Sequence, residues 1–564
     1  KDNELAGLTA GLENELSDED YFDVLEARSL RLQSRVSPIL KALDFKAQPG
    51  STMLREAIEY FKVSGGVITS AAPLDFLEPQ ERQAVLTGKN EKFRTSLYKA
   101  FLFMHTASGI KSGNLNLEHS YKYRPLDDYL IAKDRWDHNK ENLLKQADLL
   151  DFVDPKMVMH GLDKALSEQY QITNANINAG ENPHLKILAN GQFQIATPAL
   201  GSKEADPLQA LFPERHYVPL TEVLATINSH CGFLDELQHW QQRHVRNTVS
   251  PRSLIAGVMA LGCGIGIHKM GRISSQITEN ELVHAVNWYL SLDNLQAAND
   301  RVIKDMDGMD LPKIYQKDQD KLHTASDGQK FEVRRDSLNA NYSFKYFGKG
   351  QGVSAYSFID ERNLLWHSLV FSAAERESAY VIDGLMRNDV VKSDIHSTDT
   401  HGYSEAIFAA THLLGFSYAP RIKNLKKQQL YIFKSHKNDD QSDWKITPDN
   451  YVAERIIEDN WDDFLRLIVT IKLKETTASD IFRRLNSYSK QHALYKAMKA
   501  FGQIIKTLFI LRYLDELELR QAIEKQLNKV ELANRLTRAV AVGSPREYAQ
   551  AEKEEQEIAE ACNR

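Results

Sequence analysis

Cysteine is scarce in this sequence, with three in 564 residues. Cys231, Cys263 and Cys562 lie far apart, and no Cys-x-x-Cys pair occurs. An odd number of isolated cysteines argues against a disulfide framework and against cysteine-based zinc fingers, and it fits a reducing compartment. We therefore expect a cytoplasmic protein.

Long apolar runs are also missing. Crossing a bilayer takes about 18 or more apolar residues, and the most apolar stretch near the end, IIKTLFILRYL, is shorter and carries charge. The start, KDNELAGL, shows no signal-peptide pattern and no initiator Met. The end, EEQEIAEACNR, stops inside a helical pattern. These features predict a protein with no membrane partner, and we expect it to be a piece of a longer chain.

Nucleotide-binding motifs are incomplete. Gly262, Gly264 and Gly266 in LGCGIGIHKMG hint at a dinucleotide loop, but no clear strand precedes them and the later acidic residue is missing. We expect this stretch to lie in a helix packed closely against a neighbour. GKGQG lacks the Gly-Lys-Ser/Thr of a phosphate-binding loop, so it is read as a hairpin turn in which Lys349 could contact DNA.

The net charge of −7 argues against a nucleic-acid partner, but the charge is unevenly distributed. Residues 420–437 contain Lys and Arg and no Asp or Glu, and residues 466–512 are also basic. Charges are screened over about 8 Å in cellular salt, so a phosphate responds to the local surface. Each stretch is either a phosphate-binding surface or an ordinary solvated face.

The periodicity of apolar residues changes along the chain. Residues 1 to about 320 are predicted to be mostly helical. From about residue 325, KFEVRRDS and GVSAYSFIDERNLLWHSLVF alternate and predict strands. A helix, the strand VVKSDIHSTDT, the helix YSEAIFAATHLLG and the extended FSYAP follow, and then helices again. This order is typical of an α/β unit within a larger helical protein.

Asp327 lies in HTASDGQKFEVRR, where an Asp-Gly pair follows a short polar run. Asp-Gly is a common turn signal. The residue is therefore either the corner of a turn or a metal ligand at the start of the first strand. The stretch alone leaves both interpretations open, and a partner carboxylate would favour the second.

Two further carboxylates suit a shared metal site. Asp399 lies in HSTDTHGY, where a strand meets a turn. One face of the helical stretch LNKVELANRLTRAV carries Glu531, Asn534, Arg535 and Arg538 at steps of three and four residues. Two-metal phosphoryl transfer needs oxygen ligands around two divalent ions, and carboxylates suit magnesium. Taken singly, Asp399 also fits a turn and Glu531 an exposed Glu–Arg pair.

Several long motifs occur in a characteristic order: TASDGQKF, NYSFKYFGKGQGVSAYSFIDE, YVIDGL, STDTHGYSE, LLGFSYAPRIKNL, IFRRLNSYSKQHALYKAMKAFGQIIKTLFILRYL and LNKVELANRLTRAV. Together they resemble the Tn-three-family replicative transposases, which are bacterial DDE transposases. The resemblance reaches back to SAAPLDFL and GLDKALSEQY, so it covers most of the chain. It is strongest from about residue 230 to 545.

This resemblance implies a multidomain, mostly α fold with an α/β RNase H-like catalytic core that is interrupted by a helical insertion. The expected segments are a helical scaffold or linker region (1–150), a helical scaffold and dimerisation region (151–320), the first part of the core (321–438), the insertion (439–525) and closing helices with the catalytic Glu (526–564). The family also has an N-terminal DNA-binding region. We find none here and expect it to be absent.

The family's three catalytic acids, which are also its metal ligands, fall on Asp327, Asp399 and Glu531. The resemblance implies two Mg²⁺ ions per active site, with Mn²⁺ as a substitute. One departure is Val530, where the family pattern NKGE has Gly; on a helix this change should only stiffen the backbone. The candidate DNA contacts are Lys349, His401, Arg421, Lys423, Arg535 and Arg538.

The implied function is DNA transposition in the bacterial cytoplasm, in association with the nucleoid. Nicking would free a 3′-hydroxyl at each inverted-repeat end, and strand transfer would then join it to target DNA, which gives a cointegrate after replication. Because two ends must be brought together, a homodimer is expected. Two alternatives are an RNase H-like nuclease that cuts without joining and a non-enzymatic architectural DNA-binding protein.

Overall fold

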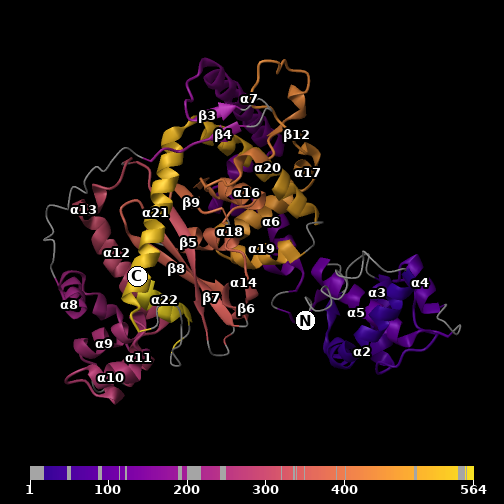
Figure 1. Ribbon diagram of the computed structural model, residues 1–564, viewed down its shortest axis with the longest axis horizontal. Coiled ribbons are helices and arrows are strands. Elements are labelled where there is room, and N and C mark those ends of the chain that lie inside the picture. The colour runs from indigo at the N-terminus through magenta and orange to yellow at the C-terminus, as the bar shows by residue number, and fades with distance from the viewer. Residues whose placement is uncertain are drawn as a thin grey trace. The chain divides into compact units, whose positions relative to one another are not determined.

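The computed structural model (Figure 1) describes residues 18–46, 52–86, 92–112, 115–120, 123–187, 193–199, 217–241, 249–318, 320–333, 337, 339–348, 350–388, 390–400, 402–487, 492–543, 553 and 555–563. The chain divides into two compact units. Lys1–Lys140 and Asp480–Lys496 form the first, and Glu141–Ser479 and Ala497–Arg564 form the second. Among the described helices, none combines the length and apolarity that a membrane span requires.

The first unit is a helical body with an aromatic core. Its main elements are α2 (Asp18–Ala42), α3 (Thr52–Val63), α4 (Pro79–Leu86), α5 (Thr95–Ser112), η1 (Leu126–Tyr129), the first part of α6 (Lys133–Gln146) and the pair β1 (Phe45–Lys46) and β2 (Asn116–Leu117). Phe61, Tyr98 and Phe101 are buried at its centre. Arg484 of α19 (Ala478–Ser487) is fully buried and donates to the Asn116 side chain, so a distant segment completes this unit.

His105 gives the first unit a pH-dependent contact. Its Nε2 lies 2.7 Å from Glu81 Oε2, and this hydrogen bond is the main reason why the pKa of His105 is raised above 6.5, although burial opposes it. The folded state therefore favours the protonated ring. The resulting stability is fully present below about pH 6.5 and is lost as the pH rises through the raised pKa.

Replacing His105 with Gln is expected to remove about 1 kcal/mol of stability at pH 5.5 and much less at pH 8.5. Pulse proteolysis in urea at the two pH values measures this difference. His138→Gln, at an exposed position of α6, is the control. An equal loss at both pH values would contradict the assignment.

The second unit begins with helices. They are η2 (Leu150–Phe152), α7 (Pro155–Ala179), α8 (Leu220–Cys231), η4 (Phe233–Glu236), α9 (Pro251–Gly262), α10 (Ile267–Ile273), α11 (Glu279–Tyr289), α12 (Leu292–Gly308) and α13 (Asp310–Lys313). Side-chain caps define the starts of two of them, because Ser250 caps α9 and Thr278 forms a capping box with Glu281 at α11. β3 (Leu185–Ile187) and β4 (Phe193–Ile195) form a small antiparallel pair.

The glycine-rich stretch after α9 is not helical throughout, which corrects one expectation. Gly264 and Gly266 have φ of 62° and 84°, a conformation that only glycine adopts easily, and they turn the chain from α9 into α10. The expected close packing is present at Gly262, where an added Cβ would lie 2.4 Å from the Ala561 carbonyl oxygen.

A six-stranded mixed sheet forms the centre of the second unit. Its strands are β5 (His323–Glu332), β6 (Asn341–Tyr342), β7 (Gln351–Asp360), β8 (Leu365–Ser372), β9 (Ile395–Thr398) and β10 (Ser417–Tyr418). The order is β10-β9-β5-β7-β6, and β8 also pairs with β7. β5, β7 and β8 are antiparallel, whereas β9 and β10 run parallel to β5. The alternating segments of the sequence thus form strands as predicted.

Helices surround this sheet. They are α14 (Phe344–Phe347), α15 (Ser378–Arg387), α16 (Glu405–Leu414), η6 (Leu425–Lys427), η7 (Lys434–His436), α17 (Glu454–Asp459), α18 (Trp461–Lys472), the start of α19, α20 (Ala493–Asp515) from Ala497 onward, α21 (Leu517–Val540) and α22 (Glu555–Asn563), with the parallel pair β11 (Tyr431–Ile432) and β12 (Asn450–Tyr451). α16 ends at Gly415 as predicted. α21 packs across β5, β7 and β9, and α22 packs against β8 (Figure 1). The chain is therefore mostly α with an α/β core.

Asp327 and Gly328 lie inside a continuous strand, so the turn interpretation is wrong. They pair with Ser357 and Tyr356 in the ladder between β5 and β7. An added Cβ at Gly328 would lie 2.8 Å from Glu377 Oε1, so the glycine lets the Glu377 side chain approach the strand closely. β6 and β7 pair antiparallel, with α14 in the connection between them, and the last two residues of GKGQG, Gln351 and Gly352, begin β7.

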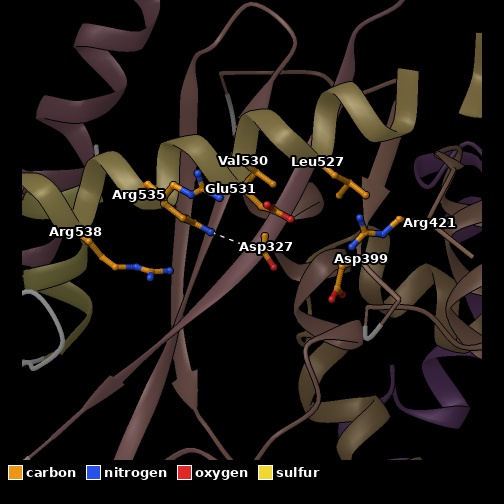
Figure 2. Close-up of a pocket in the computed structure, with 9 residues that line it drawn as sticks. Asp327, Asp399, Arg421, Leu527, Val530, Glu531, Arg535 and Arg538 are labelled. Carbon is orange, nitrogen blue, oxygen red and sulfur yellow. Dashed lines mark hydrogen bonds between the residues drawn. The ribbon is translucent and has the colours of Figure 1, made fainter. Parts of the chain in front are cut away.

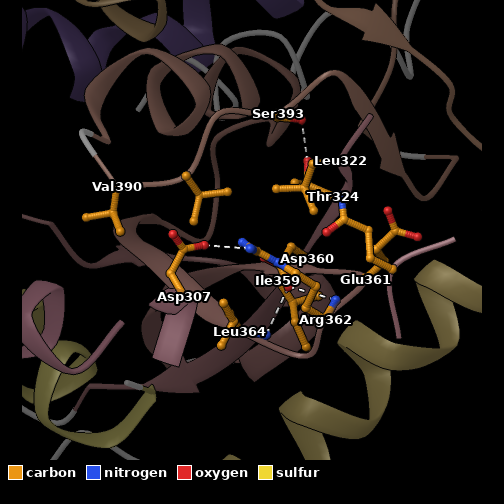
Figure 3. A network of polar contacts seen from close by, with 12 residues as sticks. Asp307, Leu322, Thr324, Ile359, Asp360, Glu361, Arg362, Leu364, Val390 and Ser393 are labelled. Carbon is orange, nitrogen blue, oxygen red and sulfur yellow. Dashed lines mark hydrogen bonds and ion pairs between the residues drawn. The ribbon is translucent and has the colours of Figure 1, made fainter. Parts of the chain in front are cut away.

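A polar network holds the turn between β7 and β8 (Figure 3). The fully buried carboxylate of Asp360 accepts from Arg362 Nε at 2.9 Å and Nη2 at 2.7 Å, and from the backbone N–H groups of Arg362 and Leu364. Arg362 also contacts Asp307 of α12. The Asp360–Arg362 pair therefore holds the turn in place, and through Asp307 the same arginine connects α12 to the sheet.

Candidate functional site

The structure brings three predicted acids to one cavity. Asp327 lies in the middle of β5, Asp399 directly follows β9, and Glu531 lies on α21. Because β5 and β9 are parallel neighbours with Ser326 opposite Thr398, the two aspartates occupy equivalent positions on adjacent strands. Figure 2 shows Glu531 projecting from α21 toward Asp327. The cavity of about 390 Å³ is lined by Asp327, Asp399, Arg421, Leu527, Val530, Glu531, Asn534, Arg535 and Arg538.

Negative charge is concentrated around Asp327. Burial raises the pKa of Asp327 to about 7, and repulsion from Asp399 and Glu377 is the next cause. Glu531 also raises the pKa of Asp327, by less, whereas a hydrogen bond from the Gly328 backbone lowers this pKa. A nearby cation would reverse the effect of these neighbours, because it favours ionised carboxylates.

These carboxylates fit a divalent cation by their chemistry, since Mg²⁺ and similar hard ions prefer oxygen ligands. In the structure, however, the three carboxylates do not form a complete coordination shell. Among the residues described, no group of three His, Cys, Asp or Glu side chains lies close enough to hold a metal ion. Glu531 is exposed on α21 and Asp399 is partly buried. The acids therefore share a cavity while remaining apart.

Buried side chains beneath the site fix the pairing of β5 with β9. His396 of β9 is fully buried, and its Nδ1 lies 2.7 Å from Thr324 Oγ1 while its Nε2 lies 2.7 Å from Ser326 Oγ. Burial lowers the pKa of His396 to about 3, so the ring is neutral and can bridge two hydroxyl groups. These contacts hold β5 and β9 in one register, and this register places Asp327 next to Asp399.

Three of the predicted DNA contacts also line the cavity. The backbone N–H of Arg421 donates to the Thr398 carbonyl at 2.9 Å, which places Arg421 beside the end of β9, and its Nη1 lies 3.4 Å from Glu524 of α21. Arg535 and Arg538 project from α21 on the Glu531 side (Figure 2). Lys423 is exposed but does not line the cavity. Lys349 and His401 lie outside the described residues.

Sequence reasoning missed two neighbours of Asp327. Gln329 is buried on β5, and Glu377 at the start of α15 forms an ion pair of 2.7 Å with Lys330. Gln329 lies two residues after Asp327, and this spacing places both side chains on one face of the strand. That signal was available in the sequence. Nothing in the local pattern around Glu377 indicates that it reaches Gly328.

Residues 222–564 match a family model described as the Tn3 transposase DDE domain. The chain belongs to this family. The expected resemblance is therefore confirmed, and DDE domains as a class depend on divalent metal ions. Val530, where the resemblance led us to expect Gly, is fully buried within α21.

Curated relatives of this Tn3-family chain extend the match beyond the domain. It is 30% identical over 541 residues to the transposase for transposon Tn2501 of Escherichia coli, with 92% of this chain and 52% of that protein covered. It is 25% identical over 536 residues to the transposase for transposon Tn1546 of Enterococcus faecium, with 93% and 53% covered. The chain thus spans about half the length of these relatives.

Proposed function

We propose that this chain carries the catalytic site of a DNA transposase that nicks 3′ ends at transposon inverted repeats and transfers them to target DNA. The observation that carries the proposal is the shared cavity. Three carboxylates from distant parts of the sequence line it together with three arginines. Membership of the Tn3 family and relatives named as transposases support the same activity.

The strand order supports an RNase H-like core. The sheet runs β8-β7-β5-β9-β10, with three antiparallel strands followed by two parallel ones. In chain order, β5 and β9 are the first and fourth of these five strands. Asp327 lies on β5, Asp399 directly follows β9, and Glu531 lies on α21, which packs over both strands. In this proposal, residues 439–525 are the helical insertion into this core, and the segments 1–150, 151–320, 321–438 and 526–564 have the roles expected from the sequence.

Each side chain has a role in this proposal. Asp327, Asp399 and Glu531 would hold two divalent ions, Mg²⁺ in the cell, and such ions would supply Lewis-acid stabilisation of the phosphate charge. Arg421 and Arg535 would bind phosphate oxygens, because the guanidinium fork matches phosphate geometry. A homodimer would bring two transposon ends to two such sites.

A strand-transfer assay with pre-cleaved transposon-end DNA and Mg²⁺ tests the proposal. Joined product is the expected result. Hydrolysis without joining would favour an RNase H-like nuclease, and binding without any reaction would favour an architectural protein.

Arg421 and Arg535 are expected to contribute to DNA affinity through phosphates. Each alanine variant should make the negative slope of log affinity against log salt shallower by about 0.9, the value for one phosphate contact. Fluorescence anisotropy with a duplex at several salt concentrations measures the slope. Arg455→Ala is the control, because its side chain is 92% exposed on α17, away from the cavity. An unchanged slope in both cavity variants would contradict the assignment.

A further inference from the structure

A chain of hydrogen bonds ends on the Asp327 carboxylate. Arg538 Nε donates to Gln329 Oε1 at 2.7 Å. Gln329 Nε2 donates to Asn534 Oδ1 at 3.0 Å, and Asn534 Nδ2 donates to Asp327 Oδ2 at 3.1 Å. The two amides are 3% and 2% exposed, so they are sealed between β5 and α21. Figure 2 shows the last of these bonds reaching Asp327 from α21.

The chemistry of the four groups fixes the direction of this chain. A guanidinium has only donors, so Gln329 must turn its oxygen toward Arg538 and its NH₂ toward Asn534. Asn534 must then turn its oxygen toward Gln329 and its NH₂ toward Asp327. Reversing either amide would place two acceptors or two donors against each other in a buried site, at a cost of about 1–3 kcal/mol per unsatisfied group.

We propose that Asn534 and Gln329 are positioning residues that orient the Asp327 carboxylate for a divalent cation, and that Arg538 sets their direction. This proposal rests on the proposed function. The hydrogen bond from Asn534 to Oδ2 holds the Asp327 carboxylate in one orientation, and lone pairs of its two oxygens remain for the ion. A carboxylate held in one orientation loses less freedom on binding than one that rotates.

Arg538 would link this series of hydrogen bonds to a bound nucleic acid. It lines the cavity, while its Nε is used inside the protein. A phosphate on the rest of the guanidinium would immobilise Arg538 and, through Gln329 and Asn534, the carboxylate of Asp327. By reciprocity, DNA binding and cation binding should then strengthen each other.

Direct Mn²⁺ binding tests the proposal without relying on turnover. The full chain and its variants are titrated with Mn²⁺ alone, and free Mn²⁺ is followed by electron paramagnetic resonance. Asn534→Ala is expected to raise the Mn²⁺ dissociation constant about 10- to 100-fold, the usual effect of removing a group that orients a metal ligand. Gln526→Ala is the matched control, because it removes a buried amide of the same helix that bonds to the Ile359 carbonyl.

Gln329→Glu is a second variant, which separates the effect of carboxylate orientation from the effect of added charge. It keeps the side-chain shape and the bond from Arg538, but it presents an acceptor to Asn534, which must then turn its oxygen toward Asp327. The proposal predicts weaker Mn²⁺ binding, whereas a simple effect of the added negative charge predicts tighter binding. Thermal unfolding of each variant checks that the fold is kept.

The outcomes separate the two proposals. Asp327→Asn should remove the Mn²⁺ site, and retention of full binding in that variant would overturn the proposed metal site itself. If Asp327→Asn loses binding while Asn534→Ala and Gln329→Glu bind as tightly as the unmodified chain, the positioning role is wrong and the metal site stands.

Discussion

Replacing Asp399 with alanine is expected to abolish strand transfer. Asp399 lies beside Asp327 at the end of the parallel pair β5 and β9, and its removal takes away one of three carboxylates that would hold the divalent ions. Such ions contribute several kcal/mol of transition-state stabilisation, so the rate should fall about a thousandfold or more. Joining of pre-cleaved end DNA to a target plasmid measures the loss, and anisotropy shows whether the variant still binds DNA.

Asp320→Ala is the matched control for this substitution. Asp320 is an exposed carboxylate just before β5 and does not line the cavity, so its removal should leave strand transfer unchanged. An Asp399→Ala chain that still forms cointegrates in cells would show that the chemistry uses other groups.

Replacing Arg362 with alanine is expected to cost about 3–5 kcal/mol of unfolding free energy. The Asp360 carboxylate is fully buried, and burial raises the pKa of Asp360 even with Arg362 in place. Loss of the guanidinium would leave the Asp360 charge buried without a partner, and an uncompensated buried charge strongly destabilises the folded state. Urea unfolding of the variant, followed by circular dichroism, measures the change.

Two further variants test the reason for this loss. Adding Asp360→Asn to Arg362→Ala removes the unpaired charge and should recover part of the stability. Arg455→Ala breaks an exposed pair with Asp459 and should cost about 0.5 kcal/mol or less. A cost below about 1 kcal/mol for Arg362→Ala would contradict the importance assigned to this network.

Much of the core could be predicted because its signals are local. Alternation over GVSAYSFIDERNLLWHSLVF predicts strands, and the structure has β7 and β8 there. Steps of three and four residues placed Glu531, Arg535 and Arg538 on one face of a helix, and all three line the cavity. The turn interpretation of Asp327 was wrong, because local turn propensity was overridden by the pairing of β5 with β7 on one side and with β9 on the other.

The parts that escaped prediction depend on contacts between distant segments. Arg484 could not be assigned to the first unit from its own helix pattern, because its hydrogen-bond partner Asn116 lies far away in the sequence. The role of Gln329 depends on Arg538 and Asn534, which become its neighbours only when α21 packs across β5. Such amides carry no local signal beyond their place on a strand or helix face.

The central claim is that Asp327, Asp399 and Glu531 bind divalent ions together. Anomalous diffraction from crystals of the chain with Mn²⁺ and a transposon-end duplex tests this most directly. The account predicts manganese peaks in the cavity, at about 2.0–2.2 Å from oxygens of all three side chains, the distance typical of small divalent ions, and Glu531 drawn inward from its exposed position. Manganese bound elsewhere, with the three carboxylates still apart beside the DNA, would contradict it.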